Sequence, residues 1–252
     1  MDSEKTQYIL KGIVHPERAT LTLEKPIKPI EVIHYSSGKK LDIELNILCN
    51  QITIWIETTD EWDIYDLRNV GRHFVLSFCS VLTFIHGYYY EIEIYQILCK
   101  EKQIDVVFGI DTPCISNRAS IKSLKNNFKN ILNVTSDETG VFFVRCFKDL
   151  NLALKDSEDT AFYCFRAIEC LRQYCKYKYK IKDKDGQWKK VWEISNYSRE
   201  YIKCIENGAG YIRHGDDLLK SDASDREDYL IKTWNVIENF IQKEFLNELN
   251  KQ

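Results

Sequence analysis

The 252-residue chain carries 35 Lys and Arg residues against 38 Asp and Glu, which gives a formal net charge of −3. This near balance excludes a protein that attracts nucleic acid or an anionic membrane through its overall charge, so any such partner must meet a local basic patch. A hydrophobic content of 44% is enough for one sizeable core or two modest ones.

Nine cysteines without a CxxC pair favour buried, reduced thiols over a disulfide framework or a structural zinc site. The first ten residues lack the apolar core of a signal peptide. The most hydrophobic run, Phe74–Ile85, is shorter than the roughly 20 residues that a membrane span requires. We therefore expect a soluble, cytoplasmic protein that makes no membrane contact.

The positions of the four prolines divide the chain, because proline breaks helix interiors but suits turns and sheet edges. All four lie within the first 113 residues. We predict an α+β fold with two domains: a β-rich α+β domain over 1–115 and an all-helical domain over 116–252.

The first domain shows the two-residue alternation of a half-buried antiparallel sheet. Strands are predicted at 6–14, 19–24, 30–35, 40–48, 51–58, 89–99 and 103–110. One long helix interrupts them, and Gly87 supplies its stop. Its apolar stripe recurs at spacings of three and four and comprises Leu67, Val70, Phe74, Phe78, Val81, Leu82 and Ile85.

After about residue 116 the apolar period becomes helical throughout. Helices are predicted at 117–133, 140–155, 158–178, 187–207 and 224–250. The last one begins with a capping box, in which Ser224 is followed three residues later by Glu227. This half of the chain is therefore predicted to be a helical bundle.

An Arg213-His214-Gly215 tripeptide lies between an apolar helix and the capped final helix. An imidazole flanked by Arg213 on one side and by Asp216 and Asp217 on the other could titrate near neutral pH and serve as a general acid or base. The alternative is structural: His214 ends a helix, where it suits the helix dipole, and Gly215 is the stop.

The order FRAIECL, a basic aromatic connector, a long apolar helix, YIRHG and a capped final helix resembles the HEPN superfamily, and within it the Apea-like HEPN proteins of bacteria. The resemblance covers residues 140–250. It implies a helical bundle that pairs into a homodimer, and a metal-independent ribonuclease of a phage-defence or toxin system. His214 and Gly215 match the family's motif, whereas its arginine, four to six residues before the histidine, has no counterpart; Arg213 is adjacent instead.

The resemblance also implies that Glu169, in the AIE element, orients the basic site together with Arg166. The alternative for these two residues is an ordinary intrahelical ion pair, since they lie three apart on one helix. A second match to the motif, Arg68-Asn69 with His73, lies in the long helix of the first domain. It is either a second site or a chance match.

The connector CKYKYKIKDKDGQWKK interleaves lysines with aromatic residues. Lysines meet phosphates and aromatic rings stack on unpaired bases, so this pattern is typical of contact with single-stranded RNA. The alternative is a solvated hairpin whose lysines face water. The candidate RNA-binding residues are Lys176, Tyr177, Lys178, Tyr179, Lys180, Lys182 and Trp188.

Two functions follow for the chain. One is a metal-independent endoribonuclease in which His214 is the acid or base and Arg213 stabilises the phosphate. The other is a non-catalytic HEPN-like module for RNA binding or oligomerisation. A homodimer through the helical domain is expected because the final helix carries Trp234, Phe240 and Phe245. No nucleotide, metalloprotease or hydrolase motif is present, so we expect no cofactor and no metal.

Overall fold

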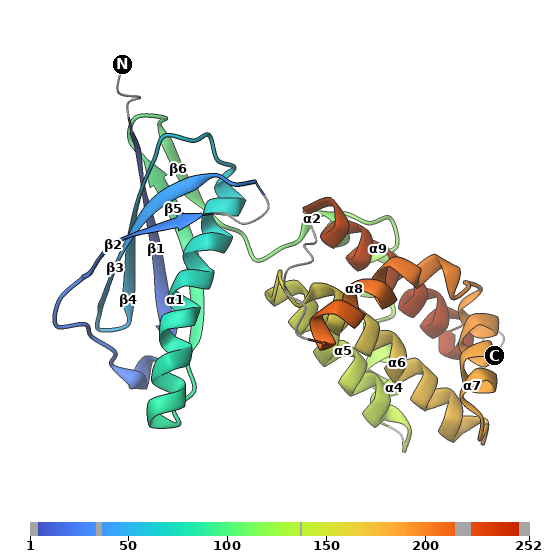
Figure 1. Cartoon of the computed structure of the whole chain (residues 1–252). Helices are drawn as coiled ribbons and strands as arrows, with labels where there is room; N and C mark the ends of the chain where they lie inside the picture. Colours follow the sequence, from blue (N-terminus) through green and yellow to red (C-terminus); the bar gives the residue numbers. More distant parts are fainter. Residues whose placement is uncertain (1–4, 34–36, 137, 215–222, 247–252) are drawn as a thin grey trace. The chain divides into compact units, whose positions relative to one another are not determined.

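The structure is a computed structural model that describes residues 5–33, 37–136, 138–214 and 223–246. The chain divides into two compact units, Met1–Ile110 and Asp111–Gln252. Strands occupy the first unit and helices the second (Figure 1), which confirms the predicted α+β class. The predicted boundary, after residue 115, falls inside the short helix α2 (Pro113–Ser116), where Pro113 occupies the first turn.

The first unit is one antiparallel sheet with the strand order β2-β3-β4-β1-β5-β6. Alternate residues of each central strand are buried on one face, as the two-residue pattern predicts. Leu41, Ile43, Leu45 and Ile47 pair with or neighbour the buried isoleucines of β4. The strands are β1 (Thr6–His15), β2 (Ile27–Ile33), β3 (Lys40–Leu48), β4 (Gln51–Thr58), β5 (Glu91–Cys99) and β6 (Ile104–Val107).

The predicted strand at 19–24 is wrong. A 3-10 turn, η1 (Glu17–Ala19), ends at Thr20, which has a φ of 47° and turns the chain. Leu21 and Leu23 still bond to the sheet, since the Asn50 amide donates to the Leu21 carbonyl and the Leu23 amide to the Ile47 carbonyl, both at 2.8 Å. The segment is therefore a strap along β3 and not a strand.

Helix α1 (Ile64–His86) packs on the sheet through a stripe that agrees with the predicted one up to Phe78 and departs from it in the last turns. Asp63 caps its start by accepting from the Tyr65 amide at 2.8 Å, and Gly87 ends it with a φ of 68°. The fully buried line is Leu67, Gly71, Val75 and Cys79, while Val81 and Ile85 of the predicted stripe are exposed. The small residues let α1 approach the sheet: a Cβ on Gly71 would lie 2.8 Å from Leu10 Cδ2.

The second unit is a helical bundle in which α6 lies at the centre, packed against α5, α7, α8 and α9 (Figure 1). Phe143, Tyr174 and Phe240 form edge-on and tilted ring contacts in its core. The helices are α5 (Gly140–Lys155), α6 (Thr160–Lys178), α7 (Lys184–Ser195), α8 (Lys203–Arg213) and α9 (Ala223–Ile241), followed by a π-helical turn, η3 (Gln242–Leu246).

Two predicted helices are broken in the structure. The helix expected at 117–133 is divided between α3 (Ile121–Asn126) and α4 (Phe128–Val134). The helix expected at 187–207 ends at Asn196, whose φ of 60° stops α7, and η2 (Glu200–Ile202) leads into α8. The final helix begins at Ala223, so Ser224 lies inside it and is not its cap; 247–250 lie outside the described residues.

The aromatic residues from which we predicted a homodimer pack in the core of the helical unit itself. Trp234 and Phe240 are buried, and Phe245 packs against the same core. The final helix therefore presents none of these three side chains as a free apolar surface. Among the described residues, no helix is long and apolar enough to cross a membrane.

Candidate nucleic-acid interface

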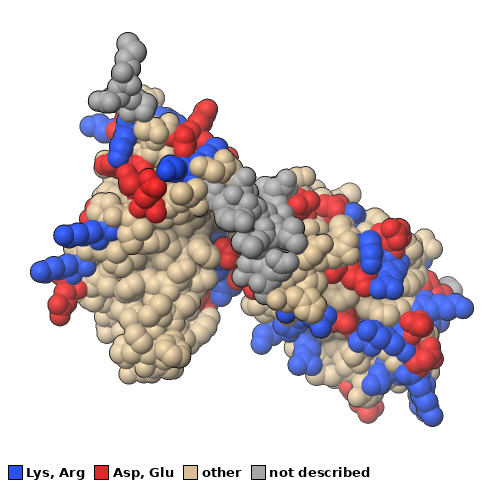
Figure 2. All heavy atoms as spheres, viewed as in Figure 1, with Lys and Arg blue, Asp and Glu red and all other residues tan. Residues whose placement is uncertain are grey.

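The lysine segment, residues 176–190, forms the most basic local surface of the helical unit. It contains seven lysines and two aspartates and so carries a local charge of +5, whereas the whole chain carries −3. Figure 2 shows basic side chains gathered over the ends of α6 and α7. The connection between the two helices is shorter than predicted: α6 ends at Lys178, as expected, but α7 begins at Lys184, three residues earlier than predicted.

The turn between the two helices is built from local backbone bonds. The Tyr179 amide donates to the Cys175 carbonyl at 3.0 Å, and Lys180 then turns the chain with a φ of 54°. Asp183 caps α7, since its carboxylate accepts from the Gly186 amide at 2.6 Å. The turn is thus fixed at both ends while its lysines remain exposed.

Gln187 holds this turn from the inside and was not predicted as a site residue. Its side chain is 3% exposed, and its amide donates to the Ile181 and Lys182 carbonyls at 3.1 and 3.2 Å. Its Oε1 accepts from Arg172 Nη1 at 2.8 Å. One buried amide therefore links α6, the turn and α7, which fixes the backbone that carries the lysines.

Most lysines of the segment have no acidic partner. Of the seven lysines in the segment, only Lys190 forms an ion pair with a described residue, Glu193, at 2.9 Å. Lys178, Lys180 and Lys182 are exposed and form no ion pair with any described residue. Their charge is available to an anionic partner, because none of the carboxylates that the structure describes forms an ion pair with them.

The three aromatic residues of the segment differ in what they can offer a base. Tyr177 is 61% exposed and leans on Phe142, with ring centroids 5.1 Å apart. Trp188 is half-buried and stacks on Trp192 at 5.2 Å, with Arg172 over it at 5.6 Å. Tyr177 is therefore the aromatic side chain of the segment with the most surface left for stacking.

Tyr179 is linked to the turn η3, which follows α9, by a carboxylate that it shares with Tyr174. Tyr174 and Tyr179 donate to Glu244 Oε1 at 2.8 and 2.6 Å. Burial raises the pKa of both phenols, and the Glu244 carboxylate raises it further, so both remain protonated donors. Lys190 Nζ lies 4.7 Å from the centre of the Tyr179 ring.

The predicted catalytic pair, Arg213 and His214, lies exposed at the end of α8. The His214 amide donates to the Gly210 and Tyr211 carbonyls at 3.2 and 3.1 Å, so His214 caps the helix as in the structural alternative. Gly215 and the aspartates at 216 and 217 lie outside the described residues.

Arg166 and Glu169 do not pair with each other, because each has another partner. Arg166 Nη2 lies 3.0 Å from Asp149 Oδ1 of α5 and also covers the Phe162 ring. Glu169 lies 3.6 Å from Arg172. The buried Asp149 was missed by the sequence interpretation, since a single acidic position in an amphipathic helix resembles a solvent-facing one.

The second motif match lies on α1 in the other unit. The Arg68 guanidinium covers the Phe108 ring at 4.8 Å, which is a packing contact. Asn69 and His73 are exposed on the same helix.

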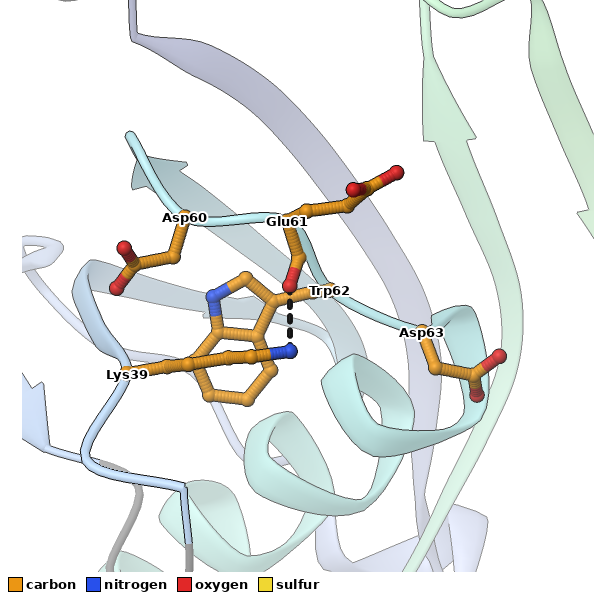
Figure 3. A pocket seen from close by; sticks show the side chains of 5 residues that line it. All are labelled: Lys39, Asp60, Glu61, Trp62 and Asp63. Carbon is orange, nitrogen blue, oxygen red and sulfur yellow. Dashed lines mark hydrogen bonds between the residues drawn. The ribbon is translucent and has the colours of Figure 1, made fainter.

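A shallow cavity of about 650 Å³ lies where the β4–α1 loop meets the start of β3 (Figure 3). Lys39 Nζ donates to the Glu61 carbonyl at 2.5 Å and lies above the Trp62 ring. Asp60 accepts from the Lys40 amide, and Asp63 caps α1. Its polar groups thus organise the loop, and no group of metal-ligating side chains occurs among the described residues.

Two protein-family models match the chain, one in each compact unit. Residues 8–108 match the family model described as domain of unknown function (DUF8168) N-terminal domain, and residues 128–244 match that of its C-terminal domain. The chain therefore contains both DUF8168 domains. Their limits fall within the two compact units, one in each. Searches of the curated proteins and of the solved structures found no match to this DUF8168 chain.

Proposed function

We propose that this DUF8168 chain is a non-catalytic, HEPN-like RNA-binding protein of a bacterial defence or toxin system, acting in the cytoplasm. The observation that carries the proposal is the group of exposed lysines, Lys178, Lys180 and Lys182, which form no ion pair with a described residue and follow the exposed Tyr177 in the chain. The central position of α6 in a helical bundle supports the HEPN-like part.

Single-stranded RNA fits this surface better than a duplex. Lysines spaced along a fixed turn can follow one phosphate backbone, and a tyrosine ring can stack on a base only when that base is unpaired. Gln187 fixes the turn before any ligand binds, which lowers the ordering cost of binding.

Endoribonuclease activity without a metal is the second candidate, and the exposure of adjacent Arg213 and His214 favours it. An exposed imidazole can exchange a proton with a reacting oxygen, and the adjacent guanidinium can contact a phosphate. In the described residues, however, Arg166 and Glu169 are held by Asp149 and Arg172, so neither supports His214 through a hydrogen bond or ion pair.

The binding proposal is tested with a labelled, unstructured RNA oligonucleotide and the full chain. The triple variant Lys178→Glu, Lys180→Glu and Lys182→Glu should lower affinity at least tenfold, because phosphate contacts become repulsive. The control, Lys25→Glu, Lys28→Glu and Lys100→Glu, makes the same change in net charge on exposed lysines of the other unit. Equal affinities for both triple variants would refute the lysine segment as the binding surface.

Cleavage is tested separately, by incubating the same RNA with the protein in the presence of a chelator that removes divalent metal ions. Under the non-catalytic proposal, wild type and His214→Ala leave the RNA intact at equal protein concentrations. Cleavage by wild type that is lost in His214→Ala would establish the second candidate instead.

A further inference from the structure

Helix α1 carries a second apolar face beside the one that packs on the sheet. Phe74, Phe78, Val81 and Ile85 follow one another at spacings of four, three and four, so they share one side of the helix. They are flanked by the buried line that begins at Leu67. Phe74 and Phe78 are half-buried against the core of the sheet, whereas Val81 and Ile85, at the far end of this second face, lie in solvent.

The exposure is concentrated in the last turns of α1 and the residues that follow. Phe84 is 90% exposed, and Val81, Ile85, Tyr88 and Tyr89 are between 57% and 68% exposed. We call these five residues the α1 patch. A single exposed apolar residue is ordinary, but five large ones within nine positions form a contiguous surface of the kind that marks an interaction site.

The α1 patch is also free of charge. None of the 18 residues from His73 to Tyr90 is Asp, Glu, Lys or Arg. Figure 2 shows the corresponding end of the sheet unit, where α1 terminates in Figure 1, without a basic or acidic side chain on the visible face. The functional surface proposed above lies in the other unit, so the α1 patch is independent of it.

We propose that the α1 patch is a self-association surface, covered by the same patch of a second copy of this chain. A two-fold interface brings each residue close to its own equivalents, so like charges at its centre would repel. A surface without charges avoids this repulsion and has the aromatic-rich, charge-poor composition of an interface core.

The size of the α1 patch suits such a dimer. Three aromatic side chains of about 150–250 Å² each, together with Val81 and Ile85, offer on the order of 600 Å² at their observed exposures. A standard interface buries about 800 Å² on each partner, so the patch with its immediate rim is large enough.

A lipid surface is the less suitable occupant. An apolar protrusion that enters an anionic leaflet is normally bordered by Lys and Arg. Here the border at Tyr89 is mixed and not basic: its hydroxyl donates to Glu91 at 2.9 Å, and Glu17 and Arg18 line the same shallow pocket.

The test measures the mass of the full chain by light scattering across micromolar concentrations. Wild type should reach twice the chain's 29.8 kDa. Phe84→Glu and Ile85→Glu should each raise the dimer dissociation constant at least tenfold, because each would bury a carboxylate in the interface near the two-fold axis. Both positions are exposed, so the fold should survive, which circular dichroism checks.

Val107→Glu is the matched control, since Val107 is 69% exposed in the same unit but lies on β6. It should leave the dimer unchanged. A monomeric wild type would overturn the proposal, as would a dimer that both α1 variants leave intact. Binding of a monomeric wild type to phosphatidylcholine vesicles, lost in Phe84→Glu, would assign the patch to lipid instead.

Discussion

Arg166 of α6 reaches across to α5 and places its guanidinium 3.0 Å from the carboxylate of Asp149, whose side chain is 2% exposed. Burial raises the pKa of Asp149, and the nearby cations Arg166, Arg145 and Lys148 oppose that rise. The Arg166 guanidinium therefore offsets part of the cost of burying the Asp149 carboxylate between α5 and α6.

Arg166→Ala should destabilise the helical unit at pH 7 by about 1–3 kcal/mol, less than the loss of a fully buried pair, because Arg166 is partly solvated. The raised pKa means that the folded state holds its proton more tightly, so stability falls as pH rises through the usual carboxyl range toward the folded pKa. Without Arg166 this fall should extend to higher pH.

Urea unfolding at pH 4.5 and pH 7 measures this effect. The difference between Arg166→Ala and wild type should be smaller at pH 4.5, where Asp149 is more often protonated. A difference that is the same at both pH values would show that Arg166 acts through packing on Phe162 alone.

Gln187→Ala should cost about 1–3 kcal/mol of stability, because it removes the hydrogen-bond partner of Arg172 and of two partly buried carbonyls. It should also weaken RNA binding, although no charge changes, since the turn that carries the lysines loses its support. Hydrogen exchange at residues 180–183 reports the loosening. Unchanged exchange there would contradict the supporting role of Gln187.

Tyr177→Ala should weaken RNA binding by about 1–3 kcal/mol if the ring stacks on a base, and Tyr177→Phe should bind like wild type. Neither change should alter the salt dependence of affinity. By contrast, changing Lys178, Lys180 and Lys182 to Gln should flatten the slope by about 0.7 for each lost phosphate contact. Titrations from low to moderate salt separate the two contributions.

Two glycines of α8 provide a matched pair for packing. A Cβ at Gly208 would lie 2.9 Å from Ala161 Cβ and 3.2 Å from Tyr229 Oη, whereas a Cβ at Gly210 would meet nothing. Gly210→Ala should stabilise by about 0.5–1 kcal/mol through helix propensity, and Gly208→Ala should destabilise by about 1–2 kcal/mol through overpacking. Thermal unfolding of both variants checks the opposite signs.

Thiol reactivity should separate the cysteines by burial. Burial raises the pKa of Cys164 and Cys175 to about 12 and that of Cys170 to about 11, so these thiols hold almost no thiolate at pH 8. Cys49 is exposed, and Cys204 Sγ lies 3.3 Å from Lys232 Nζ. Iodoacetamide should modify Cys49 and Cys204 first, as peptide mass spectrometry would show.

The sequence predicted strands well where local pattern and packing agree. The bounds of β3 and β4 match the prediction, because a strict alternation leaves one register that buries the isoleucines. The prediction from sequence was wrong where two apolar patterns overlap in one segment. In α1 two apolar faces lie side by side, and the predicted stripe includes residues of the core as well as Val81 and Ile85, which face solvent.

The candidate site was only partly visible in the sequence for a similar reason. The lysines and tyrosines stand out by composition, but Gln187 and Asp149 look like ordinary solvent-facing positions of helices until neighbouring helices cover them. Asn196 did carry a signal, since asparagine often adopts the left-handed conformation that ends a helix.

The first strand of the chain occupies the interior of its sheet. Ile9 pairs with Trp55 on one side and with Leu98 on the other. During synthesis β1 leaves the ribosome before β4 and β5, so it must wait for both strands before its two edges are bonded. Until β5 emerges, β1 is an open edge that can pair with another chain, so expression of fragments that stop after α1 should favour aggregation.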